Sequence, residues 1–221
     1  LLMIPELGPG GAERSFSKLS QLLSHRHNVY ICTNHSGNKI NYPINGQLID
    51  LKLPFSKNLF HKTFLWIKRI ISVKKIKNDL TIDTTISFLE GANYLNVFTR
   101  SRDKLLLTVR GSLKDDKMMK GLNGFIRKFF LIPKLFKGGD YLITVSDGLR
   151  NEMQDYFRIP ESKIITINNF YDIKDIQIKS KSNIKNLFKV IYEKPVIISS
   201  GRFHEQKNFY ALFSIIKLVM K

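Results

Sequence analysis

The sequence predicts an α/β fold, built as a mostly parallel, Rossmann-like sheet with helices on both faces. Short apolar runs bounded by turn residues recur over residues 1–170, and stretches with apolar residues at helical spacing separate them. Because parallel strands need a crossover between them, this alternation favours a parallel sheet covered on both sides. The third observation is a glycine-rich turn between the first strand and the first helix, a position that faces ligands in such folds.

Seven strands are expected, over residues 1–4, 28–33, 47–51, 84–88, 104–109, 141–145 and 163–167. A parallel sheet brings the carboxyl ends of its strands to one edge, where ligands bind in folds of this class. Three of these strands end in residues suited to ligand contact: Gly10-Gly11, Arg110-Gly111-Ser112 and Ser146-Asp147-Gly148. The carboxyl edge is therefore the expected site.

The turn at Gly10 and Gly11 has the composition of an anion site. Glycines let backbone amides approach a ligand, and the following helix N-terminus attracts phosphate or carboxylate. The turn is neither of two familiar phosphate motifs, since Glu13 stands where a dinucleotide fingerprint has its third glycine and no Gly-Lys-Ser/Thr follows. A tight turn without a ligand is the alternative.

Ser146 has two interpretations. It is a good N-cap for a helix that runs through Leu149, Met153 and Phe157, and capping alone explains a serine there. Its place at a strand end equally suits a ligand contact.

The composition changes after residue 170, which predicts a domain boundary. Residues 171–194 are rich in Lys, Asn and Ile without strand signals, and a strand over 195–200 and a helix from Phe209 to Val219 follow. We expect a first domain over 1–175, a linker over 176–193, and the start of a second domain over 194–221. One strand and one helix are too little to bury a core, so this second domain is expected to be truncated.

The single cysteine, Cys32, lies in an apolar run and is expected in the core, which excludes an internal disulfide and suggests a reducing compartment. No apolar stretch approaches the ~18 residues of a membrane span, and no secretory signal opens the chain. The predicted location is cytoplasmic, peripheral to the inner face of the membrane.

The net charge of +18, from 36 Lys and Arg against 18 Asp and Glu, predicts an anionic partner. Two stretches, 57–77 and 124–137, contain basic and large apolar residues but no acid. Basic helices with Trp and Phe are typical of segments that lie in a membrane interface, and an anionic membrane surface is the expected partner. Sheet-covering helices with a solvated basic face are the alternative. No recognisable nucleic-acid module is present, so nucleic acid is not expected.

Four stretches together resemble family 4 glycosyltransferases of the two-domain GT-B type. They are Gly10 to Arg14, Ser87 to Asn93, Val145 to Leu149 with Lys163 to Asn169, and Gly201 to Asn208. The resemblance implies transfer of a sugar from a nucleotide-sugar donor, with retention of configuration, to an acceptor held by the N-terminal domain. A lipid-linked saccharide or polyprenyl-phosphate acceptor in bacterial surface polysaccharide synthesis suits the basic aromatic helices.

The resemblance also implies the site residues. Arg202 and Lys207 are the expected catalytic cations, which stabilise the leaving diphosphate without a metal or other cofactor. Gly10, Gly11, Gly201, Arg202 and Lys207 are the expected donor-binding residues, and Arg110, Ser146 and Glu13 the acceptor-binding ones. Arg110 matches no family motif; it is chosen for its position at a strand end, where it is expected to meet a phosphate on the acceptor.

Two departures from the family pattern limit what is expected of the chain. The paired glutamates that contact the donor fall beyond Lys221, and no histidine (His25, His27, His35, His61 or His204) matches the one that some members use. Residues 1–221 alone are therefore expected to be inactive. The alternatives are a truncated, inactive module that binds a membrane surface and a nucleotide-sugar epimerase on the same fold.

Overall fold

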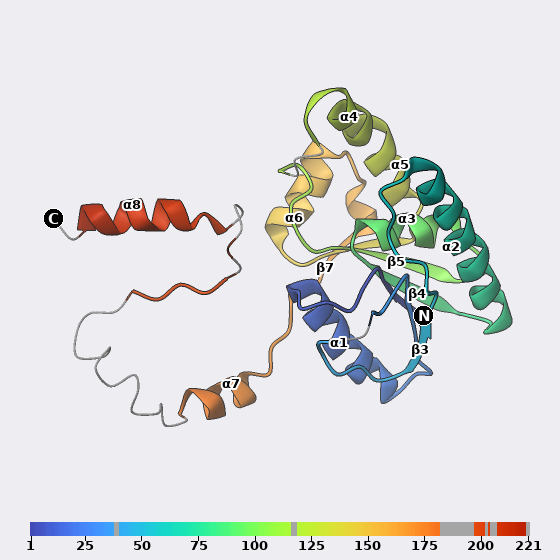
Figure 1. Cartoon of the computed structure of the whole chain (residues 1–221), viewed down its shortest axis with the longest axis horizontal. Helices are drawn as coiled ribbons and strands as arrows, with labels where there is room; N and C mark the ends of the chain where they lie inside the picture. Colours follow the sequence, from blue (N-terminus) through green and yellow to red (C-terminus); the bar gives the residue numbers. More distant parts are fainter. Residues whose placement is uncertain (38–39, 116–118, 182–196, 202, 204–206, 220–221) are drawn as a thin grey trace. The chain divides into compact units, whose positions relative to one another are not determined.

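The computed structural model describes the chain except for residues 38–39, 116–118, 182–196, 202, 204–206 and 220–221 (Figure 1). Its contacts divide it into two units, Leu1–Phe170 and Tyr171–Lys221, and each is described by itself. The predicted assignment of an acceptor domain, a linker and a donor domain stays a prediction.

A parallel sheet of seven strands forms the centre of the first unit, with the order β3-β2-β1-β4-β5-β6-β7. The strands are β1 (Leu2–Ile4), β2 (Tyr30–Thr33), β3 (Gln47–Asp50), β4 (Thr84–Phe88), β5 (Lys104–Val109), β6 (Tyr141–Thr144) and β7 (Ile164–Thr166). Every neighbouring pair is parallel. The seven predicted strands and the Rossmann-like fold class are confirmed.

The order of the strands places a reversal between β1 and β4. From β1 the chain adds β2 and then β3 on one side, and it returns with β4 on the other side of β1. Loops at such a reversal part at the carboxyl edge of the sheet and leave room for a ligand. The glycine turn follows β1 and the segment from Leu89 follows β4, so both border this point.

Helices cover both faces of the sheet (Figure 1). They are α1 (Gly11–Ser24), α2 (Leu59–Asp79), α3 (Glu90–Phe98), α4 (Gly121–Ile126), α5 (Ile132–Lys137) and α6 (Asp147–Asn151), with π-helical turns over Arg127–Leu131 and Glu152–Tyr156 and a 3₁₀ turn over Glu161–Lys163. On one face, Phe16 of α1 packs with Leu2, Ile4 and Phe88. On the other, residues of α2 and α3 pack with Met3 and Cys32, which confirms the predicted core position of the cysteine.

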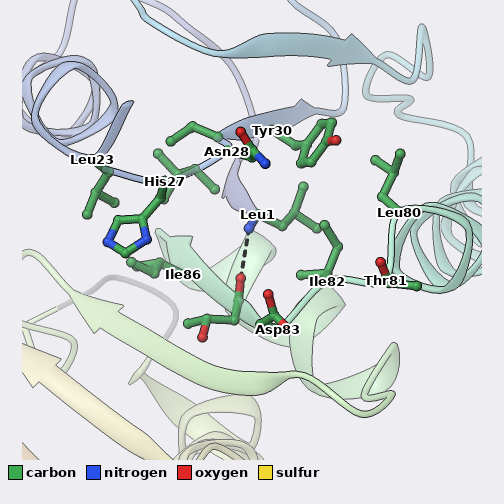
Figure 2. A pocket seen from close by; sticks show the side chains of 13 residues that line it. Leu1, Leu23, His27, Asn28, Tyr30, Leu80, Thr81, Ile82, Asp83 and Ile86 are labelled. Atoms are coloured by element: carbon green, nitrogen blue, oxygen red, sulfur yellow. Dashed lines mark hydrogen bonds between the residues drawn. The ribbon is translucent and has the colours of Figure 1, made fainter. Parts of the chain in front are cut away.

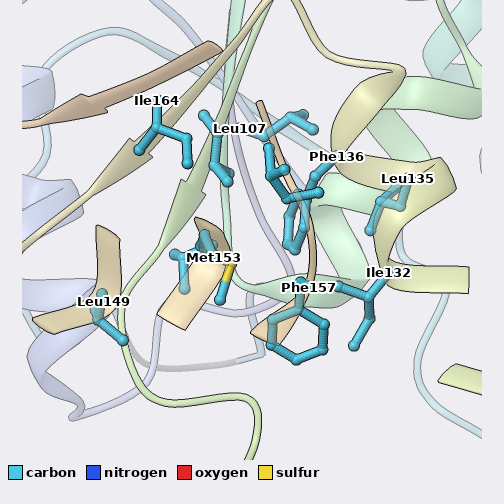
Figure 3. Packing of buried hydrophobic residues seen from close by; sticks show 11 residues of the cluster. Leu107, Ile132, Leu135, Phe136, Leu149, Met153, Phe157 and Ile164 are labelled. Atoms are coloured by element: carbon cyan, nitrogen blue, oxygen red, sulfur yellow. The ribbon is translucent and has the colours of Figure 1, made fainter. Parts of the chain in front are cut away.

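A third apolar cluster joins β5, β6 and β7 to α5, α6 and the π-helical turn that follows α6 (Figure 3). Phe136, Met153 and Phe157 are almost fully buried in it. The predicted helix through Leu149, Met153 and Phe157 is confirmed, because these residues face the cluster at helical spacing.

A buried polar network lies between α3 and the strands beneath it. Lys77 Nζ of α2 lies 2.9 Å from Asp103 Oδ2 and donates to Asn96 Oδ1 of α3 at 2.7 Å. Nearer the N-terminus of α3, Asn93 Oδ1 accepts from Ser87 Oγ of β4 at 2.7 Å. Asn93 Nδ2 donates to the carbonyl of Thr108 in β5 at 2.9 Å. These directional contacts fix α3 against the sheet, and with it the loop at its N-terminus.

The second unit contains two described helices, α7 (Ile173–Ser180) and α8 (Phe209–Val219), and the latter was predicted. The predicted strand over 195–200 is wrong where it can be compared, since 197–200 form no strand and 195–196 lie outside the described residues. A strand needs a neighbour to satisfy its backbone groups, and no described segment pairs with 197–200. Among the described helices, none is both long and apolar enough to cross a membrane.

Candidate functional site

The glycine turn opens α1 at the carboxyl edge. Gly10 is the N-cap in an extended conformation, and the Glu13 side chain folds back against it, so that a Cβ on Gly10 would lie 2.0 Å from Glu13 Oε2. Gly11 has open space where its Cβ would be. The turn therefore presents backbone at Gly11, while the Glu13 carboxylate covers part of the helix N-terminus, where its charge is favourable.

Beside it, Leu89 leaves β4 with φ 71° and ψ 155°, a backbone region that glycine favours. The next residue, Glu90, begins α3, and its Oε2 accepts from Arg127 Nη2 at 2.8 Å. Burial and the neighbouring Glu90 carboxylate raise the pKa of Tyr94 well above its ordinary value. Glu90 thus ties the π-helical turn that starts at Arg127 to the end of β4.

Arg110, which follows β5, is the most distinctive group at this edge. Its guanidinium carbon lies 4.1 Å from the ring centroid of Phe88, and Phe88 meets Phe16 of α1 edge-to-face at 5.1 Å. One nitrogen, Nη1, donates to Asn169 Oδ1 at 2.7 Å, whereas Nε is buried and has no hydrogen-bond partner among the described residues. Burial lowers the pKa of Arg110 to about 10, so it stays charged at neutral pH.

In the described part of the chain no carboxylate forms an ion pair with Arg110. Partial burial of a cation without an anion costs free energy, and a ligand that supplies the anion offsets that cost. The expected position of Arg110 at a strand end is confirmed, and the structure adds two neighbours, Phe88 and Asn169. Both lie in sequence stretches that carry the family resemblance, but no role was predicted for either.

Asn169 lies beyond β7 and reaches Arg110 across the edge of the sheet. Its Oδ1 also accepts from Ser15 Oγ of α1 at 3.4 Å. Three segments far apart in the sequence therefore meet around one amide oxygen: the first turn of α1, the end of β5 and the loop after β7. Only the spatial order of the strands reveals this meeting, because nothing in the spacing of these residues does.

Ser146 is the N-cap of α6, and its Oγ accepts from the Leu149 backbone amide at 3.3 Å. Its structural interpretation is confirmed, and the predicted contact of Ser146 with the acceptor stays a prediction, as does that of Glu13.

Gly201 and Lys207 lie in the second unit, with Cγ and Cδ of Lys207 3.3 Å from where a Gly201 Cβ would be. Arg202, the third member of that predicted group, lies outside the described residues.

A hollow of about 450 Å³ lies at the opposite, amino-terminal edge of the sheet (Figure 2). Leu23, His27, Tyr30 and Ile82 are among its lining residues. The lining also includes the carboxylate of Asp83, which would repel a diphosphate. None of the predicted site residues that the structure describes lines this hollow.

The basic helix α2 exposes apolar side chains in a row. Phe60, Phe64, Ile67 and Ile71 are all more than half exposed, and Phe60 is 87% exposed. On the inward side, Trp66, Ile70 and Val73 pack in the core, whereas Leu59 at the start of the helix is 72% exposed. Arg69 and Lys77 are buried, with Arg69 Nη2 donating to the carbonyls of Leu53 and Pro54, so neither contributes to a basic face.

A second apolar surface covers α4 and the π-helical turn that follows it. Its exposed side chains are Leu122, Phe125, Ile126, Phe129, Phe130 and Leu131. Lys128 lies between Phe129 and Tyr156, with Nζ 3.7 Å from the Tyr156 ring centroid. Ordinary sheet-covering helices bury their large apolar residues, whereas these two surfaces, which we call the α2 row and the α4 surface, leave them exposed.

Comparison with known proteins gives consistent results. The sequence pattern of Glycosyltransferase Family 4 matches residues 9–175. A Campylobacter jejuni relative, N-acetylgalactosamine-N,N'-diacetylbacillosaminyl-diphospho-undecaprenol 4-alpha-N-acetylgalactosaminyltransferase, is 27% identical over 213 residues, which are 94% of this chain and 56% of that protein.

Two solved structures share the fold. A glycosyltransferase from Rickettsia africae aligns with a TM-score of 0.58 and 15% identity over 89% of this chain and 50% of its own. Anabaena HepE, in complex with UDP and glucose, aligns with a TM-score of 0.51 and 14% identity over 78% of this chain and 45% of its own. The chain thus spans about half the length of the proteins that it matches.

Proposed function

Because the chain belongs to glycosyltransferase family 4, we propose that the full-length protein carrying it transfers a sugar from a nucleotide-sugar donor to a lipid-linked saccharide acceptor. The name of the Campylobacter relative includes an acceptor of this class, a diphospho-undecaprenol saccharide, and HepE was solved with UDP. Retention of anomeric configuration, a role in bacterial surface polysaccharide synthesis and a place at the cytoplasmic membrane face are part of the proposal.

The observation that carries the proposal is the Arg110 guanidinium at the carboxyl edge, which forms no ion pair with a carboxylate in the described part of the chain. A diphosphate-linked acceptor supplies an anion for this half-buried cation, and an arginine presents several donors to phosphate oxygens in fixed geometry. Backbone at Gly11 lies at the same edge, next to the strand reversal where ligands bind. Arg110 therefore holds the acceptor by its phosphate and leaves the sugar hydroxyl free to react.

The donor is assigned to the second unit. Gly201, Arg202 and Lys207 match the family motif whose cations reach the donor diphosphate. Charge develops on that diphosphate as the glycosidic bond breaks, and two fixed cations stabilise it in the transition state. No metal is required by this arrangement, and that expectation remains a prediction.

The α2 row and the α4 surface are assigned to the membrane. A lipid-linked acceptor resides in a bilayer, so an enzyme that uses it benefits from holding its site at the surface. Exposed aromatic side chains enter the interface, and each basic residue near an anionic leaflet adds roughly 1 kcal/mol.

The function is tested with the full-length protein, a panel of nucleotide sugars and an acceptor with a saccharide on polyprenyl diphosphate. The proposal predicts a product one sugar longer that forms only when donor and acceptor are both present. Conversion of the donor without acceptor would identify an epimerase instead. No turnover of any sugar, combined with liposome binding, would identify a binding module.

Membrane binding is tested by sedimentation with phosphatidylglycerol vesicles at physiological salt. Phe60→Asn with Phe64→Asn should weaken binding about tenfold or more, because two exposed aromatic side chains no longer enter the bilayer. Leu22→Asn on α1 is the matched control, since it removes an exposed apolar residue outside both surfaces. Equal binding by all three proteins would leave α2 as a solvated face.

A further inference from the structure

We propose that Asn169 is a positioning residue, which orients the Arg110 guanidinium toward the acceptor diphosphate without neutralising its charge. The inference rests on the proposed function, since it concerns the same site. The inference goes beyond the proposed function because it assigns a role to Asn169, a residue that lies 59 positions from Arg110 in the sequence.

The contacts fix one side of the guanidinium, and Asn169 is its only hydrogen-bond partner among the described residues. Its Cζ lies 4.1 Å from the Phe88 ring centroid, and the 2.7 Å hydrogen bond to Asn169 Oδ1 holds Nη1. The contact with the ring alone allows the guanidinium to rotate, and the directional hydrogen bond to Asn169 restricts that rotation. Nη1 is thereby held in place, while Nε is buried and has no hydrogen-bond partner among the described residues.

The chemistry of the amide explains why an asparagine serves here. A carboxylate at the same place would orient Arg110 as well, but it would form an ion pair and cancel the charge that attracts phosphate. The oxygen of a neutral amide accepts the same hydrogen bond and leaves the positive charge for the ligand. Asn169 is itself exposed, so the contact lies at the open side of the site.

Ser15 extends this arrangement to the glycine turn. Its Oγ donates to the same Asn169 oxygen at 3.4 Å, four residues after Gly11 at the start of α1. Asn169 therefore links Arg110 to the start of α1, and the two are held at a fixed distance from each other. A diphosphate site depends on such fixed relative positions, because its hydrogen-bond donors must converge on one group.

The test compares binding of inorganic pyrophosphate to the chain and to its variants by ³¹P NMR titration, with folding checked by circular dichroism. Arg110→Met should weaken binding about tenfold or more, and Asn169→Asp should weaken it nearly as much. Asn169→Ala should weaken it about threefold, because the cation stays but is no longer oriented. Asn168→Asp is the matched control, since it adds the same charge one residue away and should change binding less than Asn169→Asp.

The inference is decided by how strongly Asn169→Asp binds pyrophosphate compared with Asn169→Ala and the wild type. A purely structural role predicts that Asn169→Asp, which keeps the accepting oxygen and adds an ion pair, binds pyrophosphate as the wild type does. That result would overturn the positioning role even if Arg110→Met had lost binding. Unchanged binding by Arg110→Met would overturn both the phosphate site and its positioning.

Kinetics of the full-length protein separate this inference from the proposed function. The Asn169→Asp variant should raise KM for the diphosphate-linked acceptor about tenfold and leave KM for the donor unchanged. A folded wild-type protein that binds pyrophosphate through Arg110 but transfers no sugar would contradict the proposed function and leave the site intact. An increase in both KM values by the same factor would contradict the inference alone.

Discussion

Replacing Lys77 with methionine should destabilise the first unit by about 3–5 kcal/mol, because the carboxylate of Asp103 then stays buried without its cation. Both side chains are completely shielded from solvent, and their charged atoms lie 2.9 Å apart. Thr85 Oγ1 and the Ser101 backbone amide also donate to the Asp103 carboxylate. Although burial by itself raises the pKa of Asp103, hydrogen bonds from Lys77 and Thr85 hold that pKa below its ordinary value.

The size of the loss in unfolding free energy depends on which buried charges remain in each variant. Lys77→Met leaves an uncompensated charge, whereas Lys77→Met combined with Asp103→Asn removes both charges and keeps an oxygen for Thr85 and Ser101. The double variant should therefore recover roughly half or more of the loss. The loss in Lys77→Met should also shrink as the pH is lowered, because burial raises the pKa of Asp103 once Lys77 is gone and protonation then removes the unpaired charge.

The assay is urea unfolding followed by the fluorescence of Trp66, the only tryptophan in the sequence, whose ring meets Phe98 edge-to-face at 6.2 Å in the first unit. Lys75→Met is the matched control, since Lys75 is 74% exposed and pairs with Asp79 one helical turn away. It should change the free energy of unfolding by less than about 0.5 kcal/mol. A loss in Lys77→Met as small as in this control would refute the reasoning.

Three further predictions concern single groups. Ser146→Ala should cost about 1 kcal/mol of stability in urea unfolding, since α6 loses its cap, and an unchanged midpoint would contradict this. Burial raises the pKa of Cys32 to about 12, so iodoacetamide at pH 8 should modify the native thiol at least about 100-fold more slowly than the urea-unfolded one; equal rates would place Cys32 outside the core. Gly10→Ala should displace only the flexible end of Glu13, costing less than about 1 kcal/mol, and a larger loss that persists with Glu13→Ala would show that the turn itself requires glycine.

Much of the first unit could be predicted because its signals are local. Each strand is a short apolar run, and Cys32 sits in the middle of one. Ser146 was predicted as a cap from its place before an amphipathic helix, and the structure has that cap. The basic and apolar composition of α2 was recognised, although the sequence alone did not say which of its apolar residues face solvent.

The contacts that build the candidate site could not be predicted, because they join residues far apart in the sequence. Arg110 meets Asn169 only because the β5 and β7 ends share one edge of the sheet. Arg127 was counted among the charges of a basic stretch, but it pairs with Glu90 across 37 positions. Lys77 was likewise assigned to a basic face, and the position of Asp103 next to it turns it into a core residue.

The most direct test of the central claim is the acceptor dependence of sugar transfer by the full-length protein with Arg110→Met. If Arg110 supplies the cation for the acceptor diphosphate, KM for a polyprenyl-diphosphate saccharide should rise about tenfold or more, while KM for the nucleotide sugar and the melting temperature stay close to the wild-type values. An unchanged acceptor KM in a folded, active Arg110→Met enzyme would contradict the account.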